Sequence, residues 1–486
     1  MNAQRTESRL GQQVSEAKSD PRQTTASLRR PGILGRLGFA RSWRYSPSLV
    51  FSGSNTLCSI VFQLGILSKL GVGPRSDLYF ASIVVPMVAF TLAFGALNNV
   101  LVPMFVEAKA RGHREDTTLL WNCLLVIVVG GSLLLTFLYF SARFAFPVMF
   151  RNLVWIDLHQ VAMVLVAYSL YQVLYLAVLT KNCFLFSQGH PLSAQAGVFC
   201  GWIASLGLLW SIHPSQSLGR VPLCLVCGNA FALLYPNVTR DVFSYRSGLL
   251  KAHAQSLFRR TFPVTAGCSV GWIEPAFDGV IASTMKQGSL TIYFFFARMM
   301  LSTVTSIFTG YVQPVTKHLA ELAGASRWEE LRYETWRVAR NGVSLSVGVL
   351  TAGLFTLLFL GHSKSSLLRP YALSFGHNIP VFLLLLGYLF GALGHAVFSN
   401  SLYVLHREKL YLLATISALP AGVILKLAGA RILDLPGLAL GTSSYWFIYA
   451  GILGLCFSWA VTKQINAALS PTRTSDFDND EVALLK

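Results

Sequence analysis

The chain has 486 residues, of which 53% are hydrophobic and only 12% are charged, and its formal net charge is +18. Soluble proteins carry roughly 25% charged residues, so this composition excludes a soluble globular protein and indicates one that crosses a membrane many times. The basic residues are spread over many short loops rather than along one face, which argues against a nucleic-acid partner; in a membrane protein such an excess sets orientation.

The N-terminal segment, residues 1–47, is polar and holds nine Lys or Arg against three Asp or Glu. It contains no apolar run of the kind that a cleaved signal peptide requires. We therefore expect a disordered basic tail on the cytoplasmic side, which keeps the N-terminus inside or contacts anionic lipid headgroups.

Twelve apolar segments follow, and most are close to the length of about 20 residues that spans a bilayer core. They lie near residues 48–68, 78–103, 118–142, 160–187, 192–213, 221–238, 262–285, 290–316, 341–361, 377–404, 410–428 and 436–461. We expect the first six to form an N-lobe over 48–238 and the last six a C-lobe over 262–461. A basic cytoplasmic linker at 239–261 joins the lobes, and 462–486 is a polar tail.

The distribution of basic residues predicts the orientation. With the N-terminus inside, the inner segments hold 28 of the 39 Lys and Arg residues, the outer loops and membrane edges hold ten, and Arg298 lies within a span. Cytoplasmic loops carry the excess of Lys and Arg. Both termini are therefore expected in the cytoplasm.

The two halves repeat one another. Asp77-Leu-Tyr-Phe80 opens the second span and Thr291-Ile-Tyr-Phe294 opens the eighth, 214 residues later. Pro103 and Pro314 end the same two spans, and each is followed by a short amphipathic stretch that we expect to be helical. Six spans per half is an even number, so the repeats are parallel. This pattern predicts an all-α membrane protein of two six-helix lobes related by a pseudo-two-fold axis, with substrate held between them.

The stretch from Phe262 to Pro314 carries three charged residues within its apolar runs, namely Glu274, Asp278 and Arg298. A charge at mid-membrane costs at least about 2.5–3.5 kcal/mol, so it normally faces a partner or a water-filled cavity. We interpret this hairpin as part of the wall of a polar cavity.

Blocks in both halves resemble the MviN/MurJ family. They are Gly71–Ala81, Pro86, Phe94–Ala96, Val102–Pro103, Glu107–Lys109, Asp278–Ser283, Gly288–Ser289, Tyr293, Ala297–Arg298, Pro314, Trp328–Glu330 and Pro436–Thr442. The resemblance covers roughly residues 45–460. It implies a flippase of the multidrug/oligosaccharidyl-lipid/polysaccharide (MOP) exporter superfamily, in the bacterial inner membrane, that moves polyprenyl-diphosphate-linked sugars by alternating access between two lobes.

The sequence also departs from that family. Family members carry arginines in the first helix and in the first half of the second, and here neither Leu57–Gly65 nor Pro86–Leu92 contains one. The family's Asp-Arg pair in the eighth helix is Ala297-Arg298, and twelve spans replace the usual fourteen. These departures favour a lipid-linked glycan other than lipid II.

Arg298 is the leading candidate for substrate binding, because a guanidinium can grip a diphosphate with two parallel hydrogen bonds. An internal salt bridge to Glu274 or Asp278 is the alternative. Lys181 and Arg407, at equivalent inner ends of the fourth and tenth spans, would either catch phosphate at the cytoplasmic mouth or anchor helix ends.

Asp278, Glu274 and Lys426 are candidates for ion or proton coupling. The resemblance aligns Asp278 with an aspartate that belongs to a sodium site in some members, and places Lys426 where relatives often show Asn or Asp. A lysine there would pair with Asp278 and replace a bound cation; alternatively it extends to the outer interface. Glu274, before Pro275, is a candidate proton carrier.

No catalytic residues, metal ligands or cofactor are expected, because the sequence shows no nucleophile–base pair, metal-ligand spacing or nucleotide fingerprint. The expected partners are the lipid-linked glycan, membrane lipid and glycan-synthesis enzymes, with no nucleic acid. Three alternatives to the leading function stay open: a lipid II flippase, a cation-coupled multidrug antiporter, and a membrane glycan polymerase or ligase, although the last normally has larger exterior loops.

Overall fold

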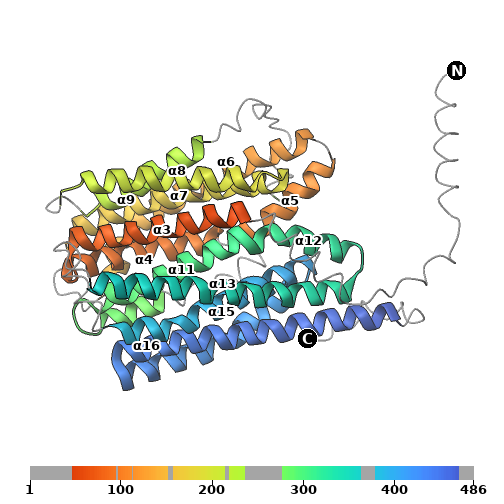
Figure 1. Ribbon diagram of the computed structural model, residues 1–486. Coiled ribbons are helices and arrows are strands. Elements are labelled where there is room, and N and C mark those ends of the chain that lie inside the picture. Colours follow the sequence, from red (N-terminus) through yellow and green to blue (C-terminus); the bar gives the residue numbers. More distant parts are fainter. Residues whose placement is uncertain are drawn as a thin grey trace, which may run out of the picture. The chain divides into compact units, whose positions relative to one another are not determined.

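The computed structural model describes residues 46–94, 97–111, 113–150, 157–213, 218–235, 255, 276–362 and 378–469. Nearly all of these residues are helical, and no strand occurs among them (Figure 1). Eight of the described helices are long and apolar enough to cross a membrane. The predicted all-α membrane class is therefore confirmed, whereas the tail at 1–45 and the basic linker lie almost wholly outside the described residues.

The first half of the chain forms a group of helices centred on α7. Its members are α3 (Ser46–Leu70), α4 (Pro74–Phe94), α5 (Leu97–Arg111), α6 (His113–Met149), α7 (Leu158–Gln188), α8 (Pro191–Ser211) and α9 (Arg220–Leu234). Helix α7 packs against α4, α5, α6, α8 and α9. The predicted second span is divided between α4 and α5, and the amphipathic stretch expected after Pro103 is the helical end of α5.

The second half begins, within the described residues, at the helical segment 276–283, so most of the predicted seventh span lies outside them. It continues with α11 (Ser289–Ile307), the π-helix η2 (Phe308–Val312), α12 (Gln313–Gly324), α13 (Trp328–His362), α15 (Ile379–Val404) and α16 (Glu408–Leu469). Helix α12 is the amphipathic helix expected after the eighth span.

Helix α16 contains both of the last two predicted spans. Its 62 residues reverse direction at Asp434, whose φ of 54° and ψ of −133° are not helical. The two arms then touch through glycines: a Cβ on Gly429 would lie 2.2 Å from the Gly437 carbonyl oxygen, and one on Gly441 would lie 2.7 Å from the Lys426 Cα. Small residues allow this close backbone approach in membranes.

Matching turns mark the repeat in the backbone. Gly71 and Gly288, which precede α4 and α11, have φ of 73° and 86°, and Gly189 and His406, which follow α7 and α15, have φ of 86° and 55°. Each pair is 217 residues apart (288 minus 71 and 406 minus 189), three more than the spacing of the motifs, because Gly71 is six residues before Asp77 and Gly288 is three residues before Thr291. Positive φ is easily adopted by glycine and rarely by other residues, so these matched turns support the pseudo-two-fold repeat.

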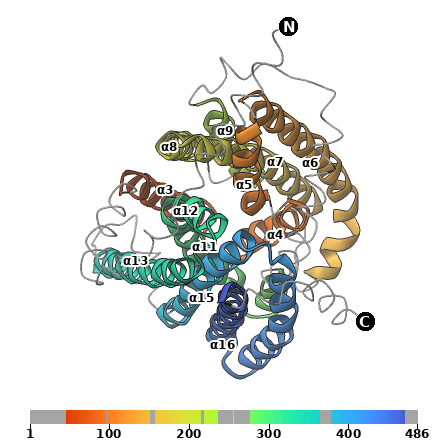
Figure 2. The same cartoon turned by 90° about the vertical axis from the view of Figure 1, so that its right-hand side faces the viewer.

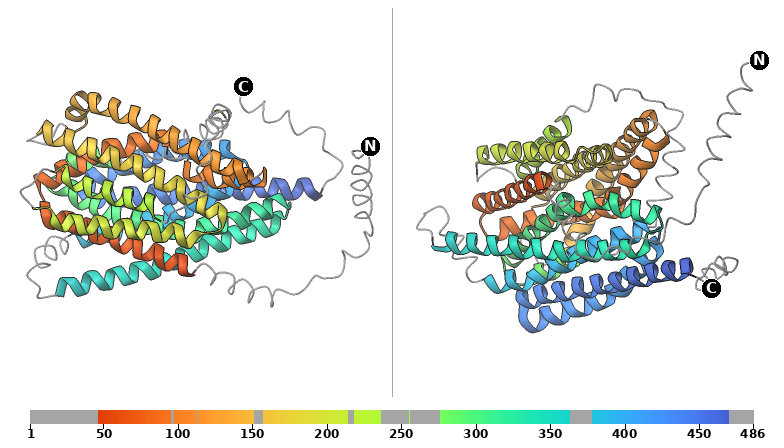
Figure 3. Two further views of the ribbon diagram at one scale, coloured as in Figure 1. Left: turned by 90° about the horizontal axis from the view of Figure 1, so that it is seen from above. Right: turned by 45° about the vertical axis from the view of Figure 1, so that its right-hand side comes forward.

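The helices form two lobes that pack mainly on themselves. We call α3–α9 the N-lobe and residues 276–469 the C-lobe; α4 and α11 make the most extensive contact between them. In the end-on view of Figure 2, α4 and α11 lie between the two groups. The α16 hairpin lies on the side of the C-lobe that is remote from the N-lobe (Figures 1 and 3).

Candidate functional site

Arg298 lies where the two lobes meet. It is nine residues after the first residue of α11, about 14 Å along a helix that begins directly after Gly288, which is close to the middle of a core of about 30 Å. Its Nη2 donates to the Tyr168 hydroxyl of α7 at 2.9 Å and lies 3.1 Å from the Met87 sulfur of α4. Both partners are neutral and both belong to the N-lobe.

The structure does not place Arg298 against Asp278, which was one expected pairing. Within the described part of the chain, no carboxylate lies within ion-pair distance of Arg298. The other expected partner, Glu274, lies outside the described residues. Arg298 is half-buried rather than buried, and within the described residues only its Nη2 has hydrogen-bond partners.

Asp278 is instead the centre of a buried polar cluster inside the C-lobe. Lys426 of α16 pairs with it, with 2.7 Å between Nζ and Oδ1, and the hydroxyls of Tyr293 and Thr442 donate to Oδ2, that of Thr442 at 3.2 Å. The Tyr293 and Thr442 hydroxyls also lie 2.8 Å from one another. Asp278 and Lys426 expose only 2% and 0% of their surface.

The expected pairing of Asp278 with Lys426 is therefore observed, and the alternative, a lysine that extends to the outer interface, is wrong. Lys426 is eight residues before the turn at Asp434, about 12 Å along the helix. The glycines of the hairpin bring its backbone against Gly441, next to Thr442, and the ammonium lies 5.3 Å from the centre of the Tyr445 ring. The carboxylate and the aromatic ring both stabilise the ammonium inside the C-lobe, so Lys426 stays buried.

Lys181 has a different environment from the one expected for a phosphate ligand. Its Nζ donates to the backbone carbonyls of Ala232, Leu233 and Tyr235 at 2.6, 3.2 and 2.6 Å. These are carbonyls at the C-terminal end of α9, where a cation is favourable. The geometry fits the alternative in which Lys181 anchors a helix end. Arg407, half-buried in the turn between α15 and α16, keeps its expected role as a prediction.

Asp77 joins the two lobes at the first turns of α4 and α11. Its carboxylate accepts from the Gly288 N–H at 2.7 Å and the Thr291 N–H at 2.9 Å, and it also accepts the Thr291 hydroxyl. Asp77 is 3% exposed. An N-terminal residue of an N-lobe helix thus caps the first turn of a C-lobe helix, satisfying donors that a helix start leaves free.

The contact partners coincide with the sequence repeat. Asp77 and Thr291 are 214 residues apart, the spacing of the two repeated motifs, and Phe80 stacks on Phe294 at the same spacing with 6.1 Å between ring centres. Two residues that occupy equivalent positions in the two repeats can touch one another only close to the axis that relates the repeats. Helices α4 and α11 therefore cross on the pseudo-two-fold axis.

Replacing Asp77 with alanine is expected to loosen this end of the lobe boundary. Loss of a cap costs about 0.5–2 kcal/mol, and about 1.4 kcal/mol changes an equilibrium tenfold. The measurement is the rate at which a maleimide labels a cysteine introduced at Ser76, a buried residue, in purified protein with and without Asp77→Ala. We expect labelling to become about tenfold faster.

Asp157→Ala is the matched control for that experiment. Asp157 caps α7 within the N-lobe, accepting from the His159 and Gln160 N–H groups at 3.0 and 3.2 Å. Its loss should cost similar stability without changing the labelling rate at position 76. Equal acceleration by both variants would show that the effect is general destabilisation and not opening of the lobes.

Beyond Arg298 along the chain, hydroxyls line the boundary between α3 and the end of α11 together with η2. Ser59 lies 3.0 Å from Ser302, Thr56 bonds to Ser306, and Ser52 lies 3.1 Å from Thr309. These neutral contacts continue the boundary beyond the apolar core, which runs across both lobes and includes the stacked rings of Phe80 and Phe294.

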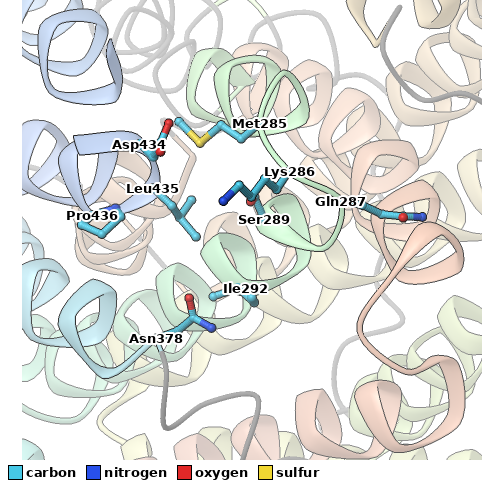
Figure 4. A pocket seen from close by; sticks show the side chains of 9 residues that line it. All are labelled: Met285, Lys286, Gln287, Ser289, Ile292, Asn378, Asp434, Leu435 and Pro436. Atoms are coloured by element: carbon cyan, nitrogen blue, oxygen red, sulfur yellow. The ribbon is translucent and has the colours of Figure 1, made fainter. Parts of the chain in front are cut away.

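A pocket in the C-lobe lies beside the turn that precedes α11 and the turn at Asp434, and not at Arg298 (Figure 4). Its volume is about 280 Å³, and Figure 4 shows Lys286 and Ser289 facing Leu435 and Pro436, while Gln287 points away. Ile292, its deepest residue on α11, is six residues before Arg298, about 9 Å along the axis. We therefore centre the candidate site on Arg298.

Sequence reasoning missed the neutral residues of both clusters. The charged groups are bound by the hydroxyls of Tyr168, Tyr293 and Thr442. In the sequence, a hydroxyl within an apolar run does not reveal that it will bind a charged side chain. Tyr168 does belong to a readable pattern, since Tyr171 and Tyr175 follow at helical spacing. Tyr293 and Thr442 lay within the blocks of family resemblance, but their contact with Asp278 required the fold.

Comparisons with known proteins agree on the fold. No protein-family model matches the sequence, and no curated protein matches it. Solved structures do match: an inward-facing multidrug resistance MATE family transporter of the MOP superfamily is 15% identical, with a TM-score of 0.62, over 86% of this chain and 99% of that one. The lipid II flippase MurJ in an inward closed conformation is 15% identical, with a TM-score of 0.61, over 87% and 91%.

A MATE transporter of Vibrio cholerae is also similar, at 12% identity and a TM-score of 0.62 over 87% of this chain and 96% of its own. Identities this low show the fold alone. The matched proteins include both a drug transporter and a lipid flippase, so the fold does not distinguish between their substrates.

Proposed function

We propose that this chain, which has the fold of the MATE and MurJ transporters of the MOP superfamily, is a flippase for polyprenyl-diphosphate-linked oligosaccharides. The observation that carries the proposal is Arg298: a guanidinium in the middle of a membrane-spanning helix, at the boundary of the lobes, with neutral partners only in the described part of the chain. An uncompensated charge at this depth is costly. A diphosphate supplies the missing negative charge and accepts two parallel hydrogen bonds.

The charges of the site argue against a cationic drug as substrate. Arg298 would repel a cation, and the Asp278 carboxylate that could attract one is already neutralised by Lys426. The multidrug antiporter is therefore the weaker alternative, although its fold is equally compatible.

Lipid II remains the second candidate substrate. A MurJ-like site would have further arginines in the first two helices; here those stretches supply neutral side chains such as Gln63 of α3 and Met87 of α4, and Met87 touches Arg298. One guanidinium would then meet the diphosphate alone. This supports a related glycan lipid of cell-envelope or exopolysaccharide synthesis, supplied by glycan-synthesis enzymes at the inner membrane.

The pair of Lys426 and Asp278 indicates how such a flippase is energised. The ammonium occupies the position at Asp278 that a bound cation would take, and being covalently attached it cannot be exchanged with solution. We therefore expect transport that does not require external sodium, driven by substrate flux, membrane potential or proton movement.

A reconstitution experiment tests the function. Proteoliposomes containing the purified chain receive a fluorescent polyprenyl-diphosphate glycan, and dithionite quenching reports the fraction in each leaflet. We expect the protein to speed equilibration, and we expect no efflux of a cationic dye. Rescue of cells depleted of MurJ would favour lipid II instead, and dye efflux without glycan movement would support the drug antiporter.

The orientation has a test of its own. Fusing alkaline phosphatase after Lys486 should give an inactive enzyme, because the 28-to-10 distribution of Lys and Arg places both termini inside. A fusion in the turn after α3, at Gly73, should be active and is the positive control. Activity at Lys486 would require an odd number of spans and contradict the parallel repeat.

A further inference from the structure

Helix α7 carries three tyrosines on the side from which Tyr168 bonds to Arg298. Tyr168, Tyr171 and Tyr175 are spaced by three and four residues, which places them on one side of a helix. The Tyr168 hydroxyl accepts from Arg298, so this side is the one turned toward the guanidinium.

The three rings form a continuous ladder that leads away from Arg298. Ring centres of Tyr168 and Tyr171 are 5.0 Å apart, and those of Tyr171 and Tyr175 are 6.0 Å apart. Exposure rises along it: Tyr168 is buried, Tyr171 is half-buried and Tyr175 is 37% exposed. From Tyr168 to Tyr175 the helix advances about 10 Å, toward the end of α7 that we expect at the cytoplasm.

The hydroxyls of Tyr171 and Tyr175 are not needed for packing. In the described part of the chain, no hydrogen-bond partner is recorded for the Tyr171 or Tyr175 hydroxyl, whereas a tyrosine hydroxyl inside a protein usually has one. Leucine or phenylalanine would pack an apolar bundle equally well without a polar group. Partly exposed tyrosines, near a guanidinium whose partners in the described part of the chain are neutral, instead fit a ligand that has rings, polar groups and an anion.

We infer that Tyr171 and Tyr175 form a carbohydrate subsite that binds the first sugar rings beyond the diphosphate held by Arg298. A pyranose has an apolar C–H face, which stacks on a tyrosine ring, and hydroxyls at its rim, which bond to the tyrosine hydroxyls. This inference rests on the proposed function and specifies the part of the substrate that it recognises. The isoprenoid has no polar rim and gains nothing from the free hydroxyls.

Binding of two matched probes to the purified protein tests the inference. One probe is farnesyl diphosphate, and the other is farnesyl diphosphate with one sugar, either glucose or N-acetylglucosamine, on its terminal phosphate. We expect wild type to bind the preferred sugar probe about tenfold more tightly than farnesyl diphosphate. Tyr171→Leu with Tyr175→Leu should abolish that gain and leave farnesyl diphosphate binding unchanged, while Tyr171→Phe with Tyr175→Phe should keep part of it.

Control variants separate the possible outcomes. Tyr139→Leu removes a tyrosine of α6 that is 42% exposed and should change neither affinity. Arg298→Ala should weaken both probes alike. Equal binding of all probes by wild type would overturn the carbohydrate subsite and leave the flippase intact, whereas no binding of any probe would overturn the proposed function itself.

Two further results would also contradict the subsite. If the leucine pair weakens farnesyl diphosphate as much as the sugar probes, the tyrosines serve the diphosphate or the isoprenoid. If the double leucine variant fails to fold, the double phenylalanine variant provides the test, because it keeps the ring shape and removes only the hydroxyls. If that variant still binds the sugar probe as much more tightly than farnesyl diphosphate as wild type does, recognition by the hydroxyls is refuted.

Discussion

Lys426→Met is expected to destabilise the protein by about 3–5 kcal/mol, the usual cost of removing one partner from a buried ion pair. Methionine fills a similar volume but leaves the Asp278 carboxylate without its ammonium, in a place where Asp278 and Lys426 expose 2% and 0% of their surface. The hydroxyls of Tyr293 and Thr442 cannot neutralise the charge. The measurement is membrane abundance together with the unfolding midpoint in detergent.

Two further variants show whether the charge is the cause. Adding Asp278→Asn to Lys426→Met removes both charges and should recover most of the lost stability, because a neutral pair of similar volume is often tolerated. Lys463→Met is the matched control, since Lys463 lies on the same helix and also over a ring, 5.5 Å from the centre of Trp459, and is only half-buried.

The same variants examine the proposed coupling. If the ammonium of Lys426 takes the place of a bound cation, Lys426→Met protein that folds should respond to external sodium, and wild type should not. Stability and transport equal to wild type, unchanged by sodium, would contradict both the structural and the coupling role of the pair.

Arg298→Ala is expected to abolish most transport while the protein still reaches the membrane. Its contacts are with neutral groups of Tyr168 and Met87, so its removal leaves no described carboxylate unpaired. Hydrogen bonds to charged groups are worth about 1.5–3 kcal/mol, which corresponds to roughly a ten- to hundredfold loss. Arg298→Lys should lose part of the transport, because lysine has the charge without the planar fork.

The comparison must measure export and abundance together. Arg340→Ala, at an exposed position of α13, should alter neither and serves as the control. If Arg298 is a structural partner of Glu274, Arg298→Ala would lower abundance and an added Glu274→Gln would restore both abundance and transport. Full export by well-expressed Arg298→Ala protein would exclude the role in binding diphosphate.

The sequence by itself determined the class of the protein and its internal repeat, and it predicted where the spans lie. Those features depend on windows of about 20 residues whose apolar character is visible without any knowledge of the fold. The matched motifs at Asp77 and Thr291 indicated a parallel repeat for the same reason. The charged residues Asp278, Arg298 and Lys426 could also be singled out, because a charge inside an apolar run is costly wherever the helix lies.

Only the tertiary structure decided what those charges touch. A helix that is apolar on all sides gives no indication of which face is turned inward, so Lys426 could equally have been expected at the interface. The rotation of the α16 hairpin, fixed by close packing of its glycines, aims it at Asp278. Arg298 meets Tyr168, 130 residues away in sequence, because the lobes cross at α4 and α11, and Lys181 is held by carbonyls of a helix end. Such contacts depend on how helices rotate and cross, which hydropathy along a chain does not encode.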